Sequence, residues 1–157
     1  VFVQMDTYAV KGLQTGQIQF LYAPTHLNPT YEYGVTFERG TAVTYGDRKQ
    51  IFISGTASID NQGEIMYPGD ILKQTERMLE NIDTLLQEAG GGLQDIMQAI
   101  VYLRDPADYV VVKQYIESRY PSFLHLIVHA PVCRPGWLIE TECIAVIPAD
   151  APQYAYL

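Results

Sequence analysis

The sequence predicts an α+β domain in which a single sheet carries two helices on one face. Three observations support this class. Apolar residues recur at helical spacing over 70–89, several shorter segments alternate in the manner of strands, and the predicted order from residue 36 is strand, strand, helix, strand, helix, strand, strand. Helices on only one side leave the second sheet face uncovered, so we also predict an oligomer.

The first part of the chain combines strand signals with turn signals. Residues 17–22 form the first strand candidate, and the proline-containing stretch 23–34 is expected to cross the surface as a linker. Residues 36–45 and 50–54 form a predicted hairpin, because Gly46-Asp47 supplies the turn between them.

Two helices are predicted, and the first has the clearer pattern. It covers 70–89, with Asp70 as a candidate amino-terminal cap and the glycines 90–92 ending it. The second starts at the dipeptide 105–106, a capping residue followed by proline, and extends over about 107–120.

The remaining segments are strands and connections. Strands are predicted at 98–103, 123–129 and 138–147. The run 54–58 is too small and too rich in glycine to form the core of a strand, and 131–137 is a bent connection with two prolines and a glycine.

Composition limits the classes of function open to the 157-residue chain. Its 48% hydrophobic content exceeds that of disordered chains, and no apolar run approaches the roughly 20 residues of a membrane-spanning helix. A formal charge of -8 argues against a nucleic-acid surface. Two cysteines with no CxxC spacing favour neither a disulfide scaffold nor a zinc site. We expect a soluble, cytoplasmic protein with no metal, nucleic-acid or membrane partner.

Two glutamates in the last predicted strand are the first candidates for chemistry. Glu140 and Glu142 are two residues apart, so both point to one sheet face within an apolar run. A carboxylate in such surroundings is costly to bury unless it is paired or protonated, and a raised pKa would suit a general acid or base. A pair of ordinary surface carboxylates is an equally good interpretation.

The bent connection before this strand contributes two more candidates. Arg134 is held between Cys133 and Pro135, and its planar guanidinium could bind a substrate carboxylate with two hydrogen bonds. An interface salt bridge is the alternative for Arg134. Cys133 beside a cation would be reactive, although a small buried hydrophobic residue is the more common role of a lone cysteine.

Further candidates could line a pocket. Phe37 and Arg39 share a strand face and would suit an organic acid, with plain sheet packing as the favoured alternative. His125 could face a cleft, but an ordinary histidine is the better interpretation, and no third ligand joins it and His129 in a metal site. Small residues let a ligand approach the backbone at three neighbouring positions. These positions are Gly55, Thr56 and Ala57.

Several ordered motifs over 36–148 resemble the RidA/YjgF family, also called the UK114 or L-PSP family. They are ISGTASID, the helix QTERMLENIDTLLQEAGGGLQDI, VYLRD and IETECIAVI. The resemblance implies a chorismate-mutase-like fold, a homotrimer with active sites between subunits, and hydrolysis of imines and enamines without metal or cofactor. It divides the chain into an amino-terminal extension or remnant of a longer chain at 1–33, the family domain at 34–148 and a tail at 149–157.

The family's functional residues match this chain unevenly. Its water-orienting glutamate matches Glu140. The position of its carboxylate-binding arginine is occupied by His125, and the position of its tyrosine by Phe37.

A second branch is similar in more detail. GVTFERG, IFISGTASI and PVCRPGWLIETE look like the carboxy-terminal half of the chorismatases, longer enzymes that hydrolyse the enolpyruvyl ether of chorismate. This likeness implies that Cys133, Arg134 and Glu140 line the catalytic pocket, with Glu140 as the general acid and Arg39 assisting carboxylate binding.

We therefore expect a cofactor-independent hydrolase of a small planar unsaturated acid, acting at subunit interfaces. A non-catalytic module that binds a small acid is the main alternative, because the family's arginine and tyrosine are replaced here. An endoribonuclease or translation inhibitor is the least favoured, since the charge of -8 opposes RNA binding.

Overall fold

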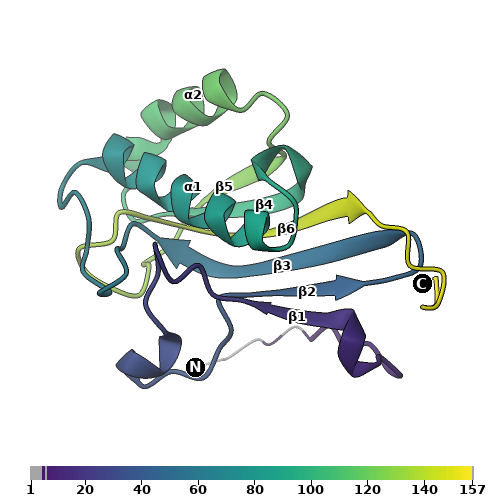
Figure 1. Cartoon of the computed structure of the whole chain (residues 1–157). Helices are drawn as coiled ribbons and strands as arrows, with labels where there is room; N and C mark the ends of the chain where they lie inside the picture. The colour runs from purple at the N-terminus through teal and green to yellow at the C-terminus, as the bar shows by residue number, and fades with distance from the viewer. Residues whose placement is uncertain (1–4, 6, 157) are drawn as a thin grey trace.

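The computed structural model describes residue 5 and residues 7–156, which form one six-stranded sheet with two α-helices on the same face (Figure 1). The strands are β1 (Ile18–Leu21), β2 (Gly40–Thr44), β3 (Arg48–Ala57), β4 (Ile96–Leu103), β5 (His125–His129) and β6 (Ile139–Pro148). The helices are α1 (Ile71–Glu88) and α2 (Tyr109–Arg119). The sheet order is β1-β2-β3-β6-β4-β5, and only the β4–β5 pair is parallel. The predicted α+β class is confirmed.

The β2–β3 hairpin forms at the predicted turn, but both strands differ from their expected bounds. β2 starts at Gly40, and before it the carbonyl of Glu38 accepts from the Oγ of Ser54 (2.7 Å). β3 continues through 55–57, so the expectation that this run forms no strand was wrong. Main-chain pairing with β6 explains the strand, since ladder hydrogen bonds need no large side chains. The register shifts between Ile53 and Thr56, which marks a bulge.

The stretch 23–34 is only in part the surface linker expected from its prolines: Pro24 and Pro29 are exposed, but other residues are anchored in the body of the protein. Ala23 and Leu27 are each 1% exposed and belong to the hydrophobic core. The carboxylate of Glu88, at the end of α1, accepts hydrogen bonds from the backbone N–H groups of Tyr22 and Ala23, both 2.8 Å. This stretch therefore packs as part of the same body as the sheet.

Helix α1 forms where the apolar stripe predicts it. The carboxylate of Asp70 caps it by accepting from the backbone N–H of Lys73 (3.0 Å), and Gly90 follows its end with a φ of +88°. Its fully buried apolar side chains pack on β3 and β6. They are Met78, Leu79, Ile82, Leu85 and Leu86. Burial of each such side chain stabilises the fold by about 1.5–3 kcal/mol.

The second helix is shorter than predicted at its start. The carboxylate of Asp105 accepts from the N–H of Ala107 (2.9 Å), as expected for a cap, but the following turn, Pro106–Asp108, is 3₁₀ and α2 begins at Tyr109. None of the helices among the described residues combines the length and apolarity that a crossing of a bilayer requires.

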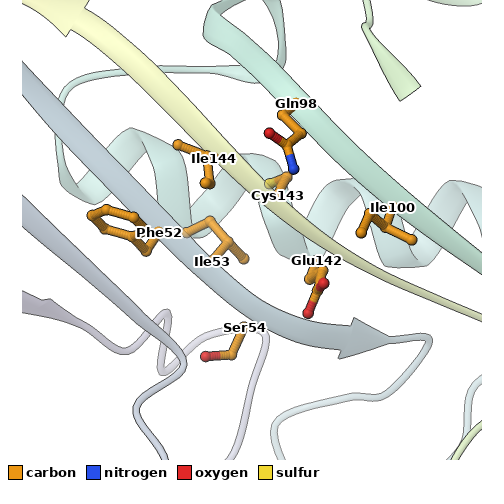
Figure 2. Close-up of a pocket in the computed structure, with 8 residues that line it drawn as sticks. All are labelled: Phe52, Ile53, Ser54, Gln98, Ile100, Glu142, Cys143 and Ile144. Atoms are coloured by element: carbon orange, nitrogen blue, oxygen red, sulfur yellow. The ribbon is translucent and has the colours of Figure 1, made fainter. Parts of the chain in front are cut away.

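One face of the sheet carries neither of the two α-helices (Figure 1). Along β6, Ile139, Thr141 and Cys143 are buried beneath the helices, whereas Glu142 and Ile144 lie on the opposite face with neighbours from β3 and β4 (Figure 2). These side chains surround a shallow hollow of about 280 Å³. The lining residues are Phe52, Ile53, Ser54, Gln98, Ile100, Glu142, Cys143 and Ile144. Tyr8 from the amino-terminal segment covers part of this face, with its ring 5.7 Å from that of Phe52.

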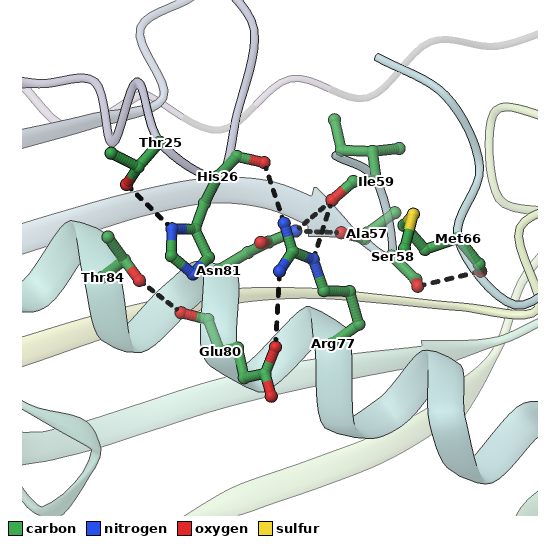
Figure 3. Close-up of polar contacts among 10 residues, drawn as sticks. All are labelled: Thr25, His26, Ala57, Ser58, Ile59, Met66, Arg77, Glu80, Asn81 and Thr84. Atoms are coloured by element: carbon green, nitrogen blue, oxygen red, sulfur yellow. Dashed lines mark hydrogen bonds and ion pairs between the residues drawn. The ribbon is translucent and has the colours of Figure 1, made fainter. Parts of the chain in front are cut away.

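Polar side chains of α1 hold the segment that follows β3 (Figure 3). The amide of Asn81 donates to the carbonyls of Ala57 and Ile59, both at 3.0 Å. Arg77 donates to the carbonyl of Ile59 through Nε (3.1 Å) and to that of His26 through Nη2 (3.3 Å). These bonds satisfy the carbonyls of Ala57, the last residue of β3, of Ile59 just after it and of His26, so α1 fixes the path of the chain at the end of β3.

Gln74 of α1 plays the same role for the connection before β6. Its side chain is fully buried, and its amide donates to the carbonyls of Tyr67 (3.2 Å) and Gly136 (3.1 Å). Its carbonyl oxygen accepts from the backbone N–H of Leu138 (3.0 Å). One side chain thus joins α1 to two loops.

Replacement of Gln74 should expose the dependence of the fold on these bonds. We expect Gln74→Leu to lower the free energy of unfolding by about 1–3 kcal/mol, because buried backbone groups lose their partners. Urea denaturation measures the change. Gln87→Leu is the matched control, since Gln87 is exposed and bonds Asp83 on the same helix. Equal losses of unfolding free energy in the two variants would contradict the view that the hydrogen bonds of Gln74 support the fold.

Candidate functional site

A cavity of about 390 Å³ lies beside the end of β3 and the start of β6. Its walls come from the chain before β2, the bulged end of β3, the turn after β3, the connection before β6 and the first residues of β6. The lining residues are Val35, Phe37, Arg39, Gly55, Ala57, Ile59, Gly63, Glu64, Ile65, Cys133, Arg134, Trp137 and Glu140. The site therefore brings together segments that are far apart in the sequence.

Most candidates from the sequence meet at this cavity. The three proposed catalytic side chains, Glu140, Arg134 and Cys133, all line it. So do four of the six proposed substrate-binding residues. Those four are Phe37, Arg39, Gly55 and Ala57.

Two candidates lie elsewhere. Thr56 is 1% exposed, and its hydroxyl donates to the carbonyl of Ser54 (2.9 Å) instead of lining the cavity. His125 lies on β5, the edge strand that β4 and β6 separate from β3. Its Nδ1 is 2.8 Å from the carbonyl of Phe123, and its ring packs against the Phe123 ring at 5.5 Å. Both contacts of the His125 ring are to Phe123 of the same chain, and the ring does not line the cavity.

Glu140 reaches the cavity by passing over Gly55, a glycine in the bulge of β3. Its carboxylate lies over the backbone of Gly55, where any Cβ would collide with it. The residue is half-buried, and its neighbours in the sheet are Ala57 on β3 and Tyr102 on β4. A glycine in the bulge thus creates the room for this side chain.

The surroundings of Glu140 raise its pKa above the ordinary value of 4.5. Burial is the main cause, because it disfavours the ionised form. The backbone N–H of Cys133 donates to the carboxylate and lowers the pKa, while the charge of Glu142 raises it. A half-buried carboxyl group with a raised pKa can hold a proton nearer to neutral pH than an ordinary glutamate can.

Glu142 shares the sheet face with Glu140, as predicted, but its environment is different. Its carboxylate accepts from the hydroxyl of Tyr102 (2.8 Å) and borders the hollow of the uncovered face (Figure 2). Burial and this hydrogen bond raise the pKa of Tyr102 to about 12. Of the two carboxylates, Glu140 is the one that enters the cavity.

Arg39 and Phe37 form the wall contributed by the chain before β2. Arg39 is 5% exposed, and its Nη2 donates to the backbone carbonyl (3.0 Å) and side-chain oxygen (3.2 Å) of Asn28. Its guanidinium carbon lies 5.6 Å from the centre of the Phe37 ring. Burial lowers the pKa of Arg39 to about 10, so the group stays cationic at neutral pH.

The sequence interpretation missed the apolar wall and the residues behind the site. Val35, Ile59, Ile65 and Trp137 line the cavity and were not chosen as candidates, although Val35, Ile59 and Trp137 belong to the quoted motifs GVTFERG, ISGTASID and PVCRPGWLIETE. Arg104, in the VYLRD motif, donates to the carbonyls of the same connection. No group of three or more His, Cys, Asp or Glu side chains within residues 7–156 is arranged to hold a metal ion.

Comparisons with known proteins agree with this fold. The Endoribonuclease L-PSP family model matches residues 40–147. The chain is 31% identical over 97 residues to the 3-aminoacrylate deaminase RutC of Acinetobacter baylyi, covering 60% of this chain and 77% of the relative. It is 35% identical over 97 residues to a RutC family protein of Pyrococcus abyssi, covering 60% and 76%.

Solved structures show the same architecture. The structure of RidA from an Antarctic Psychrobacter species superposes with a TM-score of 0.67 at 24% identity, covering 82% of this chain and 99% of that one. Yeast Mmf1 superposes with a TM-score of 0.70 at 14% identity, covering 82% and 98%. At such identities the likeness establishes the fold alone.

The contact between Gly55 and Glu140 can be tested by a double-mutant cycle. We expect Gly55→Ala to lower the free energy of unfolding by about 1–3 kcal/mol, because the new methyl group overpacks the carboxylate. The same change in a Glu140→Ala background should cost much less, because the colliding atoms are gone. Chemical denaturation of the four proteins measures the coupling, and an equal cost in both backgrounds would refute the contact.

The raised pKa of Glu140 predicts a pH-dependent stability difference from Glu140→Gln. Above pH 4.5 the unfolded glutamate releases its proton before the folded one does, so the folded state binds more protons and wild-type stability falls as pH rises. Glutamine does not titrate. Melting temperatures across this range should therefore show wild type losing stability relative to Glu140→Gln as pH increases, and parallel curves would contradict the raised pKa.

Proposed function

We propose that this chain, which belongs to the Endoribonuclease L-PSP (RidA/YjgF) family, is a cofactor-independent hydrolase of a small planar unsaturated acid. The observation that carries the proposal is the half-buried Glu140 carboxyl, with its raised pKa, in a cavity that Arg134 and Arg39 also line. A carboxylate-binding cation beside a proton donor suits hydrolysis at an sp² carbon.

The proposed reaction uses Glu140 twice. In its protonated form, it gives its proton to the β-carbon of an enamine or enol ether, and the electron pair on nitrogen or oxygen forms the double bond of an iminium or oxocarbenium ion. The resulting carboxylate takes a proton from water as the water oxygen attacks the cationic carbon. The carbon–nitrogen or carbon–oxygen bond then breaks as the proton of the new hydroxyl group passes to the leaving amine or alcohol, which leaves a carbonyl product and returns Glu140 to its protonated starting form.

The guanidinium groups of Arg134 and Arg39 would bind the substrate, and the small residues of β3 would leave room for it. Arg134 is exposed on the connection before β6, so its guanidinium is open to an incoming carboxylate. The absence of a side chain at Gly55 would let a planar carbon approach the backbone beside Glu140. The name of the RutC relative supports an enamine substrate, and an enol ether of the chorismatase type is the second form of the same chemistry.

Assembly as a homotrimer is part of the proposal. The helix-free sheet face exposes apolar side chains, including Leu126 at 61%, which favours burial against other copies of the chain. Such an assembly would also place another subunit beside the cavity.

A non-catalytic role in binding a small acid is the second candidate. It is favoured by His125, which lies outside the cavity at the position where the family resemblance predicts a carboxylate-binding arginine. Phe37 adds to this argument, because its ring has no hydroxyl to take part in chemistry.

Turnover assays separate the two candidates. We expect wild type to hydrolyse 2- or 3-aminoacrylate generated in situ, or chorismate, and Glu140→Gln to lower kcat/KM by about 100-fold or more. Glu142→Gln is the matched control, because Glu142 is two residues away on the same face but outside the cavity. It should retain most of the activity.

Three outcomes would oppose the hydrolase proposal. The first is a wild-type protein that turns over none of these acids, and the second is a Glu140→Gln variant with unchanged kcat/KM. The third is tight binding of an acid in calorimetry without turnover, which would favour the binding module.

A further inference from the structure

We propose that Arg104 is a positioning residue that holds the Val132–Cys133 peptide so that its N–H faces Glu140. The inference deepens the proposed function, because it concerns the residue that would donate the proton. It rests on a set of hydrogen bonds around one guanidinium that is not among the groups lining the cavity.

Arg104 directly follows β4 and is anchored at both ends. Its backbone N–H donates to the carbonyl of Leu138 (3.0 Å), which continues the pairing with β6. Its Nε donates to the carbonyl of Trp137 (2.7 Å), and its Nη2 donates to those of Val132 (2.7 Å) and Arg134. The guanidinium of Arg104 thus donates hydrogen bonds to three backbone carbonyls of the connection before β6.

Peptide geometry transmits this contact to Glu140. In a trans peptide, the C=O of one residue and the N–H of the next point in opposite directions. The described residues contain no cis peptide bond, so the Val132 carbonyl that points at Arg104 directs the Cys133 N–H the other way. That N–H donates to the carboxylate of Glu140. A charged donor on the carbonyl also polarises the peptide and strengthens the second bond.

Other groups around Glu140 do not replace this donor. The hydrogen bond from Cys133 lowers the pKa of Glu140, in opposition to burial and to Glu142. The titratable and charged groups that line the same cavity or neighbour Glu140 in the sheet are Arg39, Glu64, Tyr102, Cys133, Arg134 and Glu142. Cys133 and Arg134 belong to the connection that Arg104 bonds, and the other four groups lie outside it, so a change at Glu140 in an Arg104 variant reports a shift of this connection.

Arginine suits this position better than lysine. Three carbonyls accept from two different nitrogens of one planar group, and a single ammonium nitrogen does not span that arrangement. Gln74 holds the later part of the connection at Gly136 and Leu138 and has no contact with the Val132–Cys133 peptide among its hydrogen bonds. Both residues hold the later part of the connection, and of the two only Arg104 bonds the Val132–Cys133 peptide.

The test needs no substrate. In isotope-labelled wild type and Arg104→Met, NMR would follow hydrogen exchange of the Cys133 amide and titration of the Glu140 carboxyl. We expect the Cys133 amide of Arg104→Met to exchange about tenfold faster or more, the loss expected for a hydrogen bond to a charged group, and the pKa of Glu140 to rise. Titration at high salt screens the lost charge, so a rise that persists there reports the lost hydrogen bond.

Arg119→Met is the matched control, because Arg119 is an exposed arginine on α2 and should change neither reading. Arg104→Lys keeps the charge and should give a smaller change in the same direction, which decides the question if Arg104→Met fails to fold. A folded Arg104 variant with wild-type exchange at Cys133 and unchanged titration of Glu140 would overturn the inference. The hydrolase proposal fails separately, by absence of turnover in wild type.

Discussion

Helix α1 makes hydrogen bonds to the backbone of both walls of the cavity, and the geometry of the site depends on these bonds. On one side Asn81 and Arg77 bind carbonyls at and just after the end of β3 (Figure 3). On the other side Gln74 binds the connection before β6. The apolar stripe of α1 packs on the same two strands. Core packing therefore sets the distance between the walls, and a few buried polar side chains set the path of the backbone along each wall.

The chemistry of the cavity follows from two opposed influences on one carboxyl group. Burial raises the pKa of Glu140, and the N–H of Cys133 moderates that rise. Gly55 makes the burial possible by removing any side chain beneath the carboxylate, and Arg104 directs the N–H toward it. The same features that make the group a usable acid also cost stability, as expected when a fold positions an ionisable group in an apolar setting.

Local signals predicted most of the secondary structure. The stripe of α1, the Asp70 cap and the hairpin turn at 46–47 each depend on residues close in sequence, and each appears where expected. Two segments differed because distant partners outweighed local preference. Gly55–Ala57 became strand through pairing with β6, and 23–34 joined the core because Ala23 and Leu27 fill space against the helices and sheet.

The sequence by itself determined the fold class and supplied the candidate site residues, because periodicity, caps and short motifs are properties of neighbouring residues. Only the tertiary structure decided which of them meet. It placed Glu140 over Gly55, turned Glu142 toward Tyr102, and left His125 on the far edge strand. The physical reason is that strand order, register and a bulge arise from long-range main-chain pairing, which no local pattern encodes.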